Sequence, residues 1–139
     1  MQRDFILREI EKIGTIINAV RQKIFGGKDN LSLTLENTKE TLLREANFDL
    51  DIFLNLNTEK SNEYICSFDG FSIENIELFA ECLSNIGFDG KCENSKKYLE
   101  KALQLYDLCN LKSKTYSFER ETNINTLKNA LKQHSTENE

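Results

Sequence analysis

Apolar residues recur at helical spacing along the first 26 residues of the chain. Six of them follow a 4-3-4-3-4 spacing that forms one stripe along a helix, namely Ile6, Ile10, Ile13, Ile17, Val20 and Ile24. Gly26-Gly27 comes next, and glycine commonly supplies the left-handed conformation at a helix end. The pattern predicts a helix that ends there, and Gly14 within it indicates a close helix crossing. The stripe spans only about three heptads, so packing within the chain is favoured over a dimer seam.

The middle of the chain predicts short helices rather than a linker. One helix is expected over Leu35–Ala46, and residues 47–49 interrupt it. Asp49 and Asn57 are suitable N-caps for two short helices that follow, the second running to Phe68. The segment is too apolar to remain in water, because it contains Phe48, Leu50, Ile52, Phe53, Leu54 and Leu56.

Three further helices are expected in the C-terminal half. Ser72 is the N-cap of the first, and the segment 87–90 (GFDG) ends it. Asn94 or Ser95 caps the next helix. The last helix begins between residues 113 and 117 and runs to about Lys132.

These elements predict an all-α fold, an antiparallel helical bundle of about five to seven helices. The absence of proline supports long helices joined by short turns. We expect a single domain over residues 1–134, with N-terminal helices in 1–57 and a helical pair within 72–132. The polar residues 135–139 are expected to form a disordered tail.

The segment Ile76–Cys109 has the 34-residue period of a tetratricopeptide (TPR) repeat. Gly90 falls on the turn glycine of that pattern, and Leu99 and Ala102 fall on its large and small positions. The other matching positions are Phe79 and Ser95. Cys92 and Asp107 depart from it, where the pattern has an aromatic residue and a proline. The segment is therefore interpreted as a TPR-like helix pair, with a generic antiparallel helix pair as the alternative.

Taken together, three stretches resemble a family of small uncharacterised bacterial proteins that has a TPR-like C-terminal half. They are DFILREIEKIGTII in the first helix, NFDLDIFLNLNTE around the break, and the segment from Ile76 through Tyr106 into SFERETNINTLKNAL. The resemblance covers most of residues 5–131. It implies the fold, and it brings no activity, cofactor or catalytic residue.

The charge and the cysteines of the chain indicate which cellular compartment and which kinds of partner to expect. The net charge is −5, although residues 1–28 hold six Lys/Arg and three Asp/Glu, a balance of +3. An acidic chain is a poor candidate for nucleic-acid binding. The first residues lack a signal-peptide pattern and no apolar run approaches a membrane span, so a cytoplasmic location is expected. The cysteines form no CxxC pair and are expected to be reduced and buried: Cys66, Cys82, Cys92 and Cys109.

The familiar catalytic and metal-binding patterns do not occur. His134 is the only histidine and lies in the polar tail, which leaves no base for a triad and no ligand for a histidine metal cluster. Residues 25–29 (FGGKD) follow a helix and lack the full phosphate-loop pattern, so a helix cap is favoured. Asp49 and Asp51 are interpreted as capping and surface groups, and the group Glu119, Arg120 and Glu121 as ordinary helix surface. We expect no enzyme activity, cofactor or metal.

The four tyrosines are the remaining candidates for a binding site. Exposed aromatic side chains on a TPR-like pair can anchor a peptide, and the candidates are Tyr64, Tyr98, Tyr106 and Tyr116. The alternative is that they complete the core with their hydroxyls at its rim. The sequence therefore favours a non-enzymatic protein-interaction or scaffold module that binds a protein partner or itself. The alternative function is a peripheral membrane or nucleic-acid-associated protein that uses the basic N-terminal helix.

Overall fold

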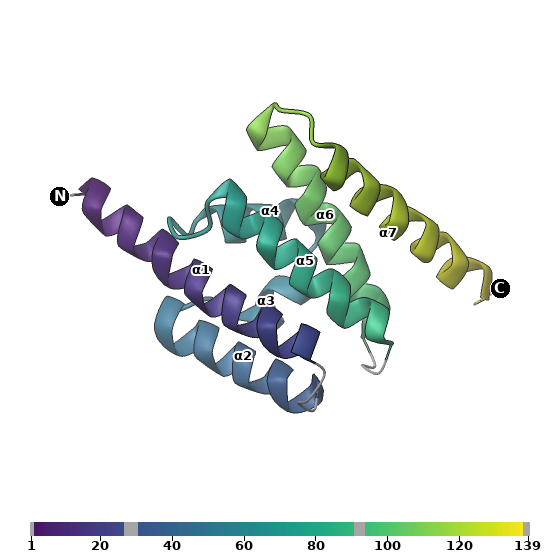
Figure 1. Cartoon of the computed structure of the whole chain (residues 1–139), viewed down its shortest axis with the longest axis horizontal. Coiled ribbons are helices and arrows are strands. Elements are labelled where there is room, and N and C mark those ends of the chain that lie inside the picture. The colour runs from purple at the N-terminus through teal and green to yellow at the C-terminus, as the bar shows by residue number, and fades with distance from the viewer. Residues whose placement is uncertain (1, 27–30, 91–93, 138–139) are drawn as a thin grey trace.

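The computed structural model describes residues 2–26, 31–90 and 94–137, and these residues form seven α-helices and no strand (Figure 1). The helices are α1 (Gln2–Gly26), α2 (Leu31–Ala46), α3 (Leu50–Asn55), α4 (Thr58–Cys66), α5 (Ile73–Asp89), α6 (Ser95–Ser113) and α7 (Phe118–Glu137). The predicted all-α helical bundle is confirmed. Helix α2 begins four residues before the expected Leu35, and α7 continues past the expected Lys132 to Glu137.

The long helices α1 and α2, α5 and α6, and α6 and α7 pack in pairs that run in opposite directions (Figure 1). The hydrogen bond of the Cys109 thiol to the Ile73 carbonyl places the end of α6 at the start of α5. Helices α1 and α5 run in the same direction, because Asn75 bonds to Ile10 and Cys82 bonds to Ile17. In Figure 1, α1 and α2 lie on one side of α5, and α6 and α7 lie on the other side.

The caps that the sequence predicts for the short helices are present. Asp49 accepts a hydrogen bond from the Ile52 amide at the start of α3, and Asn57 accepts one from the Lys60 amide at the start of α4. Asn47 adopts a positive φ of 58° after α2, and the Phe48 amide bonds back to the Leu42 carbonyl. This left-handed ending turns the chain into the core.

Phe48 lies at the centre of an aromatic cluster. Its ring centroid is 5.0–5.8 Å from those of five other rings: Phe53, Tyr64, Phe68, Phe71 and Phe79. Phe48 and Phe53 are fully buried. The apolar middle segment therefore contributes to the core as expected, although Ile52 is half exposed.

Two glycines mark close helix contacts. A Cβ atom at Gly14 would lie 3.2 Å from the Asn75 side-chain oxygen, in agreement with the crossing expected there. A Cβ atom at Gly87 would lie 2.7 Å from Leu99 and 3.0 Å from the Ser95 carbonyl. Gly87 therefore lies within α5 and lets α6 approach, whereas Gly90 ends the helix with a φ of 72°.

Helices α5 and α6 form an antiparallel pair over the segment that has the repeat period. Gly90 occupies the predicted turn, and Leu99 and Ala102 are buried as the pattern requires. Cys92 lies outside the described residues. The pairing of two helices is observed, and their relation to the TPR repeat stays a prediction.

Candidate functional site

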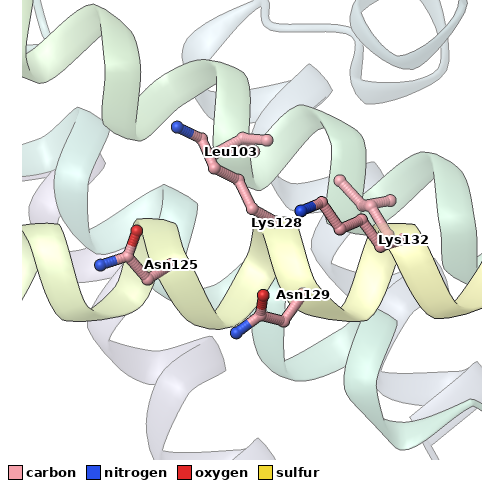
Figure 2. A pocket seen from close by; sticks show the side chains of 6 residues that line it. Leu103, Asn125, Lys128, Asn129 and Lys132 are labelled. Atoms are coloured by element: carbon pink, nitrogen blue, oxygen red, sulfur yellow. The ribbon is translucent and has the colours of Figure 1, made fainter.

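A groove runs along α6 between the α3–α4 turn and α7. It consists of two hollows of about 630 and 680 Å³ that share Leu103 and Leu131. Figure 2 shows the hollow between α6 and α7, where the Lys128 side chain extends from α7 toward Leu103 on α6. Leu103 and Leu131 are half-buried, so the groove has an apolar centre with polar side chains around it.

Lys101 forms part of the groove wall and is only 6% exposed. Its ammonium donates hydrogen bonds to the Leu56 carbonyl at 2.7 Å, to Ser61 Oγ at 2.9 Å and to Gln104 Oε1 at 3.2 Å. The ammonium also lies 5.4 Å from the centroid of the Phe53 ring. All three protons are thus directed to neutral acceptors.

The residues around Lys101 hold the α3–α4 turn against α6. Gln104 donates to the Asn62 side chain at 2.9 Å and to the Thr58 carbonyl at 3.3 Å. Ser61 donates to the Asn57 carbonyl at 2.8 Å, so its hydroxyl is both donor and acceptor. Since α4 begins at Thr58, this network fixes the first turn of α4 at the edge of the groove.

The groove carries an excess of positive charge. Its lining includes four lysines and two carboxylates, which are Lys97, Lys101, Lys128, Lys132, Glu100 and Asp107. Burial lowers the pKa of Lys101, while the charge of Glu100 opposes that shift and that of Lys97 adds to it. Within the described part of the chain, no ion pair with a carboxylate is formed by Lys97, Lys101 or Lys128.

Arg120 is the second buried basic residue of this half of the molecule, and it corrects a prediction. The sequence placed it on an ordinary helix surface, yet it is only 6% exposed. It forms a two-pronged ion pair with Glu77 of α5, with both N···O distances at 2.9 Å. It also donates to Asn110 and Ser113 of α6. Arg120 therefore joins three helices, an arrangement that a pattern of single-helix faces could not reveal.

The structure separates the four candidate tyrosines. Tyr98 and Tyr106 are buried, each 2% exposed, and burial raises the pKa of Tyr106 above its ordinary value. Tyr64 is half-buried in the aromatic cluster, where its hydroxyl accepts a hydrogen bond from the Asp49 amide. Three of the four thus take part in packing, and Tyr116 is 74% exposed. The structure brings none of them into the groove lining.

Tyr116 lies between α6 and α7, in a segment of the sequence that carries two more exposed apolar side chains. Leu111 is 74% exposed and Phe118 is 77% exposed on either side of it in the sequence. A second exposed group lies near the start of α1, where Phe5 and Leu7 are each more than half exposed.

The cysteines and carboxylates take structural positions. Cys82 and Cys109 are buried as expected, and burial raises the pKa of each thiol to about 12. The expectation of burial is wrong for Cys66, which is exposed, with its sulfur 3.5 Å from Lys112 Nζ. Asp51 pairs with Lys39 at 3.0 Å. Within the described part of the chain, no three His, Cys, Asp or Glu side chains are grouped so that they could hold a metal ion.

Comparison of the chain with protein-family models, with curated proteins and with solved structures gave no match. The resemblance to a family of small bacterial proteins therefore stays a prediction. None of the helices in the described ranges combines the length and the apolar character that crossing a bilayer requires.

Proposed function

We propose that this protein is a non-enzymatic interaction module that binds a protein partner in the groove along α6. The observation that carries the proposal is the groove itself, with an apolar centre at Leu103 and Leu131 and a polar rim. An apolar centre within a polar rim is the usual anatomy of a protein-binding surface. The TPR-like interpretation of α5 and α6 adds support, because repeats of that kind act through partner binding.

Buried hydrogen bonds join the helices that form the groove walls, which favours binding. Lys101 and Gln104 attach α6 to the start of α4, and Arg120 attaches α7 to α5 and α6. A preformed surface avoids part of the ordering entropy that association otherwise costs. The groove walls are thus fixed by two separate sets of buried hydrogen bonds.

Site-specific photo-crosslinking in the cells that produce the protein tests this proposal. A photoreactive amino acid would replace Glu100 or Asn129 in the groove, and Leu43, which is exposed on α2, would serve as the matched control. We expect protein adducts from the two groove positions and not from Leu43. Equal adducts at Leu43, or none at the groove, would contradict the proposal.

Two further measurements separate the possible partners. A photoreactive group at Tyr116 tests the exposed tyrosine, and adducts confined to that position would place the binding surface at the α6–α7 turn instead of the groove. Sedimentation of the purified protein at two concentrations tests self-association. A dimer that dissociates on dilution identifies the partner as a second copy, whereas a strict monomer leaves a different protein.

The second candidate function is peripheral membrane binding through the start of α1. The observation that favours it is the exposure of Phe5 and Leu7 beside Arg3 and Arg8. Acidic residues on the same helix oppose it. Co-sedimentation with vesicles of anionic lipid at low salt tests this candidate, and protein that stays in the supernatant would eliminate it.

A further inference from the structure

We infer that the occupant of the groove is an acidic amphipathic peptide segment, with a carboxylate near Lys97 and Lys101 and apolar side chains against Leu103 and Leu131. This inference rests on the proposed function, because it names the chemistry of the partner at the same surface. The first support is the charge of the groove. In a chain with 23 acidic and 18 basic residues, its lining carries four lysines against two carboxylates.

The second support is the state of Lys101. Its charge is removed from water and receives only neutral acceptors, the Leu56 carbonyl, Ser61 and Gln104. A buried cation without a carboxylate carries a desolvation cost that a counter-ion lowers. The three hydrogen bonds hold the Lys101 ammonium at the groove wall. A carboxylate of the partner can therefore interact with the positive charge without displacing these hydrogen bonds.

Two neighbours strengthen the positive field at that end. Lys97 is held by Asn55, with its Nζ 2.8 Å from the Asn55 oxygen, and both residues line the groove. The first turn of α4, at Asn57 and Thr58, lies at the same edge, and a helix N-terminus carries a partial positive charge. Lys97, Lys101 and the start of α4 thus lie at one end of the groove, where Glu100 and Asp107 offset part of their positive charge.

The shape of the groove favours a peptide over a compact anion. Its two hollows extend from the α3–α4 turn to α7, and the two leucines that they share form the apolar middle. A segment that places an acidic residue one or two helical turns from an apolar one fits this order. Glu100 and Asp107 stand within the same lining and would repel a continuous run of phosphates.

Binding of defined peptides to the full-length protein tests the inference. The probe is a fluorescein-labelled amphipathic peptide with leucines at helical spacing, two glutamates placed one helical turn from a leucine, and neutral polar residues at the other positions. Two matched peptides carry glutamine or lysine in place of every glutamate. We expect the glutamate peptide to bind by fluorescence anisotropy, the glutamine peptide to bind at least about tenfold more weakly, and the lysine peptide not to bind.

Variants of the protein locate the contact. Replacing the half-buried Lys97 and the exposed Lys128 in the double variant Lys97→Gln/Lys128→Gln should lower the affinity at least about tenfold. Lys23→Gln, which removes the same kind of charge from the exposed surface of α1, should lower it little. Amide chemical shifts recorded during the titration should change along α6 and α7. These variants leave Lys101 and its buried network in place, so folding is not the variable.

The outcomes distinguish this inference from the proposed function. Equal binding of the glutamate and glutamine peptides, absence of binding by the glutamate peptide, or shift changes confined to other helices would each overturn the inference. Tighter binding of a single-stranded oligonucleotide than of the acidic peptide would do so too. Crosslinks at Glu100 or Asn129 would still support a partner of other chemistry, whereas their absence would remove the proposed function itself.

Discussion

Two buried basic residues, Lys101 on α6 and Arg120 on α7, differ in the groups that accept their hydrogen bonds. Arg120 and Lys101 are each 6% exposed. Arg120 meets a carboxylate, Glu77, in a two-pronged pair at 2.9 Å. Lys101 meets a carbonyl, a hydroxyl and an amide oxygen. The hydrogen bonds that Arg120 donates to Glu77 raise the pKa of Arg120, whereas burial lowers the pKa of Lys101.

This difference in hydrogen-bond acceptors distinguishes a residue that stabilises the fold from one that can interact with a binding partner. The guanidinium of Arg120 is complementary to one carboxylate and two α6 side chains, so its charge is balanced within the molecule. The charge of Lys101 is held at a groove wall and lacks a carboxylate partner among the described residues. Equal burial therefore does not imply an equal role, and the nature of the acceptors decides.

The largest expected effect comes from Arg120→Leu. The variant leaves Glu77 without its partner and removes the bonds to Asn110 and Ser113. Breaking a fully buried ion pair costs roughly 3–5 kcal/mol. A third of the Glu77 side chain is still exposed, at 34%, so we expect a smaller loss, about 2–4 kcal/mol in the free energy of unfolding. Urea unfolding measures it.

A second variant shows how much of that loss is an orphaned charge. Arg120→Leu/Glu77→Leu removes both members of the pair, so no carboxylate stays unpaired, and we expect it to recover part of the lost stability. Glu121→Gln on the same helix is the control and should change stability by less than about 0.5 kcal/mol. A double variant that is less stable than Arg120→Leu would argue against an ion-pair origin.

Lys101→Met is expected to cost less than Arg120→Leu. It removes three hydrogen bonds and leaves the acceptors at Leu56, Ser61 and Gln104 without this donor. It also removes a buried charge, which offsets part of the loss. The net expectation is a loss of about 1–2 kcal/mol, again from urea unfolding. A loss as large as that of Arg120→Leu would mean that the two residues have the same structural role.

The pH dependence of these two variants should differ. Because the pKa of Lys101 is lowered, the folded chain releases this proton before the unfolded chain does, and the stability of the wild type relative to Lys101→Met rises as the pH approaches 10.5. The pKa of Arg120 is raised above an ordinary value that already exceeds this pH range, so the cost of Arg120→Leu should stay constant over the same range. Urea unfolding from pH 8 to 10.5 provides the comparison.

The buried thiols also titrate in this pH range, so the stability of each variant must be compared with that of the wild type at the same pH. Burial raises the pKa of Cys82 and Cys109 to about 12 from 9.0. The unfolded chain then loses these protons first, and the stability of every version falls as the pH rises above 9. That decrease is common to wild type and variants, so it cancels in their difference. A cost of Lys101→Met that falls with pH would contradict the assigned shift.

Local patterns predicted the elements of the fold well. The stripe in α1, the caps at Asp49, Asn57 and Ser72, and the turn at Gly90 depend on residues close together in the sequence. Such features follow from spacing and from backbone conformation alone. The burial of Phe48 followed likewise from its apolar neighbours.

The candidate site could not be predicted in the same way. Arg120 and Glu77 are 43 residues apart, and Lys101 and Ser61 are 40 apart. A lysine on an amphipathic helix ordinarily faces water, and only the position of the α3–α4 turn shows that Lys101 does not. The tyrosines show the opposite error. Tyr98 and Tyr106 were candidates for exposed binding residues, and both are buried in the core. Lys101 and Gln104 are three residues apart on one helix face, and that spacing by itself does not mark a buried lysine.

The smallest expected effect on stability is that of Lys97→Gln and Lys128→Gln. These variants test whether the groove lysines serve binding, in contrast to Arg120, which stabilises the fold. Lys97 makes one exposed hydrogen bond, to Asn55, and Lys128 is exposed on α7. Surface changes of this kind alter stability by less than about 0.5 kcal/mol, which corresponds to a Tm within about 2 °C of the wild type. Thermal unfolding followed by circular dichroism measures it. If the lysines of the groove are kept for a partner, these two variants retain the fold while losing affinity for an acidic peptide. A Tm lowered as far as that of Arg120→Leu would instead show that the groove lysines stabilise the fold, as Arg120 does.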